Sequence, residues 1–219
     1  MKRKKLIVLV IILILGIIYG VYYLQESNDP YSEYNQISPR ETLMKRESHI
    51  YYVYFYKTDC PYCKKIDKEI KLFADNKDYN VYFVNVENYK NDIKSYDWTN
   101  FNTNNDIEIG KSQDGKNIEY YNGESEEKYL NSKTINQYGK KIRYEIKIAD
   151  KKYMETNKNA KEGYVYATIQ TPEIDYSELK TGREPTIAGV PTLLKIENKK
   201  VSEFYFDSIE IKPFLDNKK

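Results

Sequence analysis

The most informative segment of the chain is Ile50-Tyr-Tyr-Val-Tyr-Phe-Tyr56, which continues, after Lys57-Thr-Asp59, into Cys60-Pro-Tyr-Cys63. Its first seven residues are uninterrupted aromatic and aliphatic β-formers, which predicts a central strand buried on both faces. The apolar period then becomes helical, carried by Cys63, Ile66, Ile70 and Phe73. The sequence therefore predicts a strand, a tight junction that holds both cysteines, and a helix.

Outward from this stretch, residues 80–86 return to an alternating strand pattern. A strand, a helix and a strand with short connections predict a βαβ unit with parallel strands and a right-handed crossover. Upstream, Ser38-Pro-Arg-Glu41 has the pattern of a capping box, which predicts a helix from there to about Glu47. The overall fold class is expected to be α/β, with a central mixed sheet flanked by helices.

The C-terminal part adds a second group of elements. Gly189-Val-Pro191 opens a strand to Ile196, and the turn at Asn198-Lys-Lys200 predicts a hairpin with a strand over 201–206. Asp207 is expected to begin a last helix that ends near Leu215.

Residues 99–184 separate the two parts and are rich in Lys, Asn and Tyr. Apolar residues alternate with polar ones over 142–148 and 165–169, which predicts paired strands. A segment of this length is too long for a structureless loop in a compact domain. It is therefore expected to be a folded insertion between the halves 38–98 and 185–219 of one domain.

Composition excludes several classes of protein. The chain has 219 residues with 35 Lys and Arg against 33 Asp and Glu, and four of the basic residues lie within the first five positions. The rest therefore carries a formal charge of −2, which argues against a nucleic-acid partner. Two Cys and one His make neither a disulfide scaffold nor a four-ligand zinc site, so we expect no metal and no cofactor.

The N-terminus is expected to be a membrane anchor. Residues 6–24 form an uncharged stretch of 19 residues, close to the length that spans a bilayer. The basic residues among the first five predict that residues 1–5 form a cytoplasmic tail. Residues 25–37 are expected to be a polar linker. The protein would then span the membrane once, with its body on the extracytoplasmic side. The alternative is a cleaved signal peptide, which the missing small-residue cleavage site disfavours.

The two cysteines are the candidate catalytic residues. At a strand-to-helix junction, Cys60 meets the free N–H groups and partial positive charge of the helix N-terminus, which stabilise a thiolate. Pro61 suits the first turn because it lacks an N–H that would have no partner there. Cys63 lies one turn on, near enough to attack a mixed disulfide at Cys60. Lys57, Lys64 and Lys65 add positive charge nearby.

Together, Cys60-Pro-Tyr-Cys63 in this setting and the downstream Val190-Pro191 resemble thioredoxin-fold thiol–disulfide oxidoreductases. The resemblance covers about residues 50–98 and 185–216. It implies that Pro191 is cis beside the cysteines and that Val190, with Pro61 and Tyr62, forms the groove for a substrate backbone. Tyr54 stands where thioredoxins carry a buried acid. Trp98 either lines this groove or packs as an ordinary core residue, the latter being favoured.

With the expected anchor and insertion, the chain resembles the membrane-anchored extracytoplasmic branch of that family in bacteria, which includes accessory proteins of bacteriocin export. The implied function is disulfide exchange with exported protein or peptide clients. A membrane electron-transfer partner would exchange electrons with the cysteine pair. The alternative is an export or envelope-assembly accessory that mainly binds a client through the insertion. A structural disulfide, half of a shared metal site and a metal chaperone are less favoured. The sequence leaves oxidant, reductant and isomerase open, because none of its motifs fixes a reduction potential.

Overall fold

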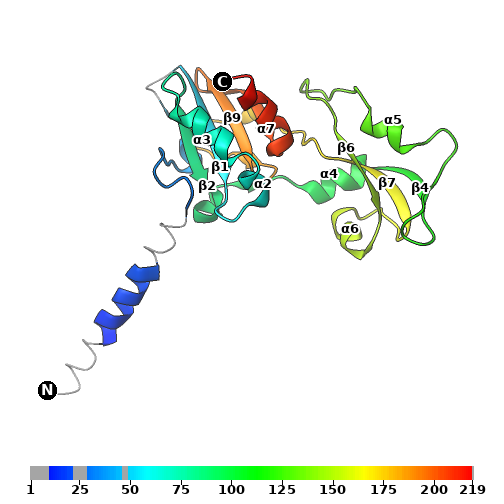
Figure 1. Ribbon diagram of the computed structural model, residues 1–219, viewed down its shortest axis with the longest axis horizontal. Coiled ribbons are helices and arrows are strands. Elements are labelled where there is room, and N and C mark those ends of the chain that lie inside the picture. The colour runs from blue at the N-terminus through cyan, green and yellow to red at the C-terminus, as the bar shows by residue number, and fades with distance from the viewer. Residues whose placement is uncertain (1–9, 22–28, 46–48, 219) are drawn as a thin grey trace.

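The computed structural model describes residues 10–21, 29–45 and 49–218. The chain is mixed α/β with several sheets, and it forms two lobes that lie side by side (Figure 1). The main lobe holds a four-stranded sheet in the order β10-β9-β1-β2, and the insertion lobe, residues 98–172, holds a second sheet in the order β5-β4-β7-β6. The main-lobe elements are η1 Pro39–Glu41, β1 Ile50–Tyr56, α2 Pro61–Lys64, α3 Asp67–Asp75, β2 Val81–Asn85, η2 Val86–Tyr89, β3 Lys94–Ser95, η3 Tyr176–Glu178, β8 Thr186–Ile187, β9 Thr192–Glu197, β10 Lys200–Phe206 and α7 Asp207–Asp216. Those of the insertion lobe are α4 Trp98–Asn105, β4 Ile107–Lys111, β5 Glu119–Tyr120, α5 Glu126–Leu130, β6 Tyr144–Ile148, α6 Lys151–Thr156 and β7 Tyr164–Ile169.

Strand β1 is the centre of the main sheet, as its sequence predicts. It pairs in parallel with β2 and antiparallel with β9, and every residue from Tyr51 to Tyr56 is buried. On one face its even-numbered side chains pack with α3 and α7. On the other face its odd-numbered side chains pack with Ile37 and Leu43, which flank η1, and with Tyr176 of η3. The predicted βαβ unit is therefore confirmed.

The predicted active-site helix is divided. Helix α2 ends at Lys64, α3 begins at Asp67, and the intervening Ile66 is fully buried with φ near −125°. The predicted hairpin is confirmed, because β9 and β10 pair across Asn198 and Lys199, both with positive φ.

The helix expected from Ser38 is shorter than predicted. The Glu41 carboxylate accepts hydrogen bonds from the Ser38 backbone N–H at 2.9 Å and from its hydroxyl, so the capping box is present. The regular turn nevertheless stops at Glu41. The Thr42 hydroxyl donates to the Pro39 carbonyl and the Tyr51 hydroxyl to the Thr42 carbonyl, so side chains occupy acceptors that a longer helix would use. Residues 46–48 lie outside the described part.

The insertion folds around its own core. The predicted strand pair is confirmed: β6 and β7 are antiparallel, with Tyr144 opposite Ile169. Ile109, Tyr129, Val165 and Ala167 form the centre of that core. The chain leaves the main lobe after β3 and has returned to it by Ile174, and β8 then pairs in parallel with β3. The return is earlier than the predicted boundary at 184, because Ile174 and Tyr176 are buried in the main core.

Two expectations for the N-terminal region are corrected. Among the described residues, no helix is long and apolar enough to cross a membrane. The predicted transmembrane segment over 6–24, and the membrane location inferred from it, are therefore wrong; residues 6–9 and 22–24 lie outside the described part. The linker expected over 25–37 also differs, since Tyr31 and Ile37 pack into the main lobe.

Candidate functional site

The two cysteines lie where β1 gives way to helix, as the sequence predicts. Cys60 is the N-cap residue of α2, and Pro61 occupies the first helical turn. Cys63, one turn on, is joined to Cys60 in a disulfide, with 5.1 Å between the two Cα atoms. The chain thus places a two-cysteine couple at a helix N-terminus, with no free cysteine elsewhere in the described residues.

The surroundings of Cys60 Sγ favour negative charge on that atom. The Cys63 backbone N–H donates to Cys60 Sγ at 3.0 Å. A thiolate formed at Cys60 on reduction would accept the same bond, and a hydrogen bond to an ionised acceptor is about twice as strong as a neutral one. Both sulfurs are nearly covered, at 5% and 3% exposure of their residues, whereas Tyr62 between them is 56% exposed.

The segment before β9 reaches the cysteine pair from the far side of the sequence. The Val190–Pro191 peptide bond is cis, as the resemblance implies. The Val190 carbonyl oxygen lies 3.7 Å from Cys60 Sγ, and Pro191 is buried directly after it. The Thr192 hydroxyl donates to the Gly189 carbonyl at 2.7 Å, which holds this loop in shape. The candidate residues from both halves of the domain therefore meet at Cys60.

The lysines contribute less charge to the site than the sequence suggests. Lys64 pairs with Asp59 at 3.5 Å on the surface, and the Lys65 ammonium lies 4.8 Å from the centre of the exposed Tyr62 ring. Exposed ion pairs are weak and screened by salt. The backbone N–H of Cys63 is therefore the better-placed stabiliser of a thiolate.

A small cavity of about 320 Å³ opens beside Cys63. Tyr31, Lys57 and Asp67 line it together with the second cysteine. The ring of Tyr31 packs edge to face with that of Tyr54, whose hydroxyl is buried and whose pKa is raised by that burial. Sequence reasoning missed Tyr31 and Asp67; the only signal was aromatic residues in the presumed linker.

A larger cleft of about 780 Å³ lies between the two lobes. The cysteines do not line it, but Tyr62, which stands between them in the chain, and Val190, whose carbonyl lies beside Cys60 Sγ, do, together with Trp98. The Trp98 indole N–H donates to the Ala188 carbonyl at 2.7 Å, and its ring packs against Phe206. Trp98 therefore does both of the things considered for it: it is packed, and it forms part of the groove wall.

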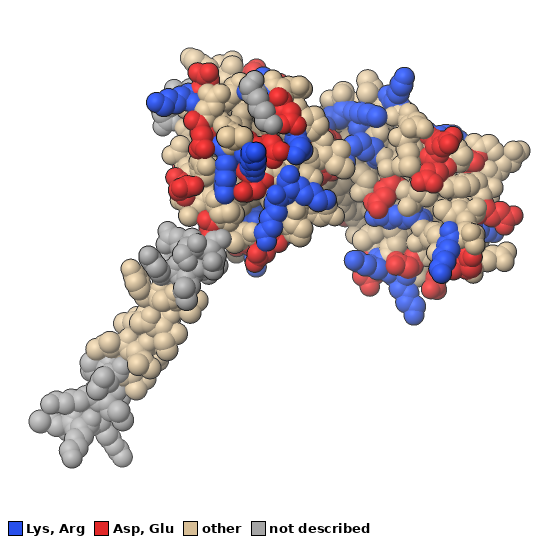
Figure 2. Space-filling view, in the orientation of Figure 1, with Lys and Arg blue, Asp and Glu red and all other residues tan. Residues whose placement is uncertain are grey.

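Among the described residues, no group of three or more His, Cys, Asp or Glu side chains could hold a metal ion. On the face shown in Figure 2, basic and acidic side chains are interspersed over both lobes. Comparisons with protein families, with curated proteins and with solved structures found no match to this chain.

Proposed function

We propose that the chain is a thiol–disulfide oxidoreductase that works through the Cys60–Cys63 couple. One observation carries the proposal: the disulfide caps the N-terminus of α2, where Cys60 Sγ accepts the Cys63 N–H and lies 3.7 Å from the Val190 carbonyl. The cysteine motif and the cis Pro191 add the resemblance to thioredoxin-fold enzymes as further support.

A structural role explains the disulfide less well. A bridge between residues three apart closes a very short loop, and the stabilisation from closing a loop falls as the loop shortens. The segment it would fasten already has its hydrogen bonds, since the Lys64 N–H donates to the Cys60 carbonyl. The disulfide therefore adds little to the stability of the fold.

In the reducing direction, the Cys60 thiolate attacks one sulfur of a client disulfide. A mixed disulfide forms between Cys60 and that sulfur, and the other client sulfur leaves as a thiolate that takes up a proton. Cys63 then loses its proton and attacks Cys60 Sγ, which releases the second client thiol and regenerates the Cys60–Cys63 disulfide. Two electrons pass from the protein to the client, and the reverse sequence oxidises a dithiol client.

Single-cysteine variants test the proposal. The reduced wild-type chain should reduce a small disulfide such as hydroxyethyl disulfide, and Cys60→Ser should abolish the reaction. Cys63→Ser should still attack but should accumulate the mixed disulfide, visible by mass spectrometry as an adduct at Cys60. Full exchange activity in Cys60→Ser, or an adduct found mainly at Cys63, would contradict the mechanism.

A further inference from the structure

The cleft between the lobes has one apolar wall, which continues from the cysteine pair. Tyr62 and Ile209 are 56% and 64% exposed, which is high for large apolar side chains, and both line this cleft. Val190 and Phe206 extend the same wall inward. Exposed apolar side chains that gather beside one groove mark a binding surface.

The insertion lobe supplies the opposite wall, which is mostly polar. Arg143, Glu145 and Lys147 recur at alternate positions along one side of the β6 strand region. Thr168, opposite Glu145 on β7, and Gln170, directly after β7, line the same wall. Leu130, at the end of α5, is 47% exposed and adds an apolar contact at this wall.

Strand β6 is also the edge of its sheet, because it pairs only with β7. The Gln170 N–H donates to the Arg143 carbonyl, and the Ala149 N–H donates to the Tyr164 carbonyl. Alternate residues of an antiparallel strand point their backbone groups to opposite sides, so those of Tyr144, Ile146 and Ile148 point away from β7. No backbone hydrogen bond among the described residues occupies these groups. Such a free edge can pair with an added extended chain.

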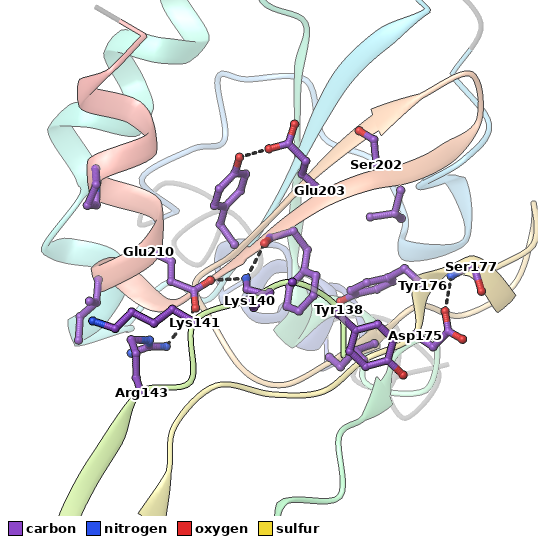
Figure 3. A pocket seen from close by; sticks show the side chains of 17 residues that line it. Tyr138, Lys140, Lys141, Arg143, Asp175, Tyr176, Ser177, Ser202, Glu203 and Glu210 are labelled. Carbon is purple, nitrogen blue, oxygen red and sulfur yellow. Dashed lines mark hydrogen bonds and ion pairs between the residues drawn. The ribbon is translucent and has the colours of Figure 1, made fainter. Parts of the chain in front are cut away.

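Ion pairs between the lobes hold the two walls together, as Figure 3 shows around a neighbouring pocket. Lys140 donates to the Phe204 carbonyl at 2.7 Å and pairs with Glu210, while Arg143 pairs with Asp207 at 2.9 Å. These side chains are only 14–20% exposed. The insertion is thus fastened to the start of α7, whose Asp207 N–H in turn donates to the Pro191 carbonyl.

From these features, and resting on the proposed function, we infer that the cleft binds an extended polypeptide segment that carries a cysteine and apolar side chains. The apolar wall takes the side chains next to the cysteine, the edge of β6 pairs with the backbone, and Cys60 takes the sulfur. The five residues of β6 span about 17 Å, enough to pair with an extended segment of similar length. A small thiol fits less well, since it has no strand backbone to satisfy that edge.

Exchange rates with two substrates test the inference in the full chain. One substrate is an unstructured peptide of about ten residues, with one cysteine among Leu and Val, blocked as a mixed disulfide with mercaptoethanol. The other is hydroxyethyl disulfide. Leu130→Glu should lower the rate with the peptide about tenfold and leave the rate with hydroxyethyl disulfide unchanged. Leu72→Glu is the matched control, because Leu72 is 50% exposed on α3 and does not line the cleft, and it should change neither rate.

Peptide chemistry tests the backbone pairing separately. Two peptides are compared, one N-methylated at the odd-numbered amides and one at the even-numbered amides. Only one of them should exchange more slowly than the unmodified peptide, because only every second amide of a paired strand faces its neighbour. Equal effects of Leu130→Glu and Leu72→Glu on the peptide rate would overturn the inference. So would a faster, Leu130-dependent reaction with oxidised glutathione than with the peptide, which would make the occupant a small molecule.

Failure of the proposed function is distinguishable from failure of this inference. A fluorescent peptide with serine in place of its cysteine measures occupancy of the cleft without any redox step. Binding that Leu130→Glu weakens about tenfold supports the inference even if no disulfide exchanges. Absence of binding to the wild-type chain, or binding that Leu130→Glu leaves unchanged, refutes it even if exchange with hydroxyethyl disulfide proceeds.

Discussion

Removing the hydroxyl of Tyr54 should stabilise the protein. Tyr54 is fully buried on β1, and its hydroxyl makes no hydrogen bond of normal geometry, although the Tyr31 hydroxyl is a polar neighbour. Its ring lies 5.6 Å from the ring of Tyr31 and 5.7 Å from that of Phe83, both edge to face. Tyr54→Phe keeps these ring contacts and removes only a group that lost its hydration on folding. An unsatisfied buried polar group costs about 1–3 kcal/mol.

The position two residues along the same strand provides the matched control. The Tyr56 hydroxyl donates to the Asp29 carboxylate at 2.7 Å, and Tyr56 is equally buried. A hydrogen bond to a charged acceptor contributes about 1.5–3 kcal/mol. Tyr56→Phe should therefore destabilise the chain by about that amount, and also leave Asp29 with one donor fewer. The same chemical change should thus act with opposite sign at the two sites.

Urea unfolding of both variants in the disulfide form measures the difference. Trp98 is the one tryptophan of the chain and packs against Phe206 of the main lobe, so its fluorescence reports on the region where the lobes meet. The midpoint should rise for Tyr54→Phe and fall for Tyr56→Phe at an unchanged slope. A gain of 1 kcal/mol corresponds to about 2–4 °C in melting temperature for a chain of this size. If Tyr54→Phe lowered the free energy of unfolding as Tyr56→Phe does, the Tyr54 hydroxyl would have a partner and the reasoning would be refuted.

Three further predictions concern the lobe junction, the capping box and the cysteine pair. Glu210→Gln removes the negative charge that pairs with Lys140 and should lower the free energy of unfolding by about 2 kcal/mol. Glu145→Gln, in an exposed pair with Lys147, should change that free energy by less than about 0.5 kcal/mol. Equal effects of the two variants in urea titrations would contradict a structural role for the lobe junction. The Ser38 backbone N–H holds the pKa of the Glu41 carboxyl below its ordinary 4.5, so the stability it adds is present above about pH 4.5 and is lost as the pH falls through that lowered value. Glu41→Gln should therefore flatten the acid limb of a stability-against-pH curve, and an unchanged limb would count against the capping interaction. After reduction, limited iodoacetamide near pH 7 should modify Cys60 before Cys63, because Cys60 Sγ accepts the Cys63 N–H; tryptic mass spectrometry gives the order, and the reverse order would argue against Cys60 as the nucleophile.

Much of the main lobe could be predicted because its signals are local. An uninterrupted apolar strand, a change to the helical period at Pro61 and a turn at Asn198 each act through neighbouring residues, and each element is present. The N-terminal region shows the weakness of local signals. Apolar length alone suggested a membrane span that the described helix does not provide. The short polar segment before Tyr31 suggested a tether, although Tyr31 is buried against β1.

The chemistry available to this protein can be inferred from local sequence: two cysteines one helical turn apart follow a strand, and Pro61 lies in the first turn of the helix. The surroundings of the two cysteines depend on the tertiary structure. The contact between Val190 and Cys60 joins residues 130 positions apart, and the polar wall and free edge of β6 come from the insertion. Such contacts depend on how sheets and lobes pack, a long-range property that no periodicity in a short window encodes. For the same reason the unpaired Tyr54 and the paired Tyr56 look alike in the sequence and differ only in the fold.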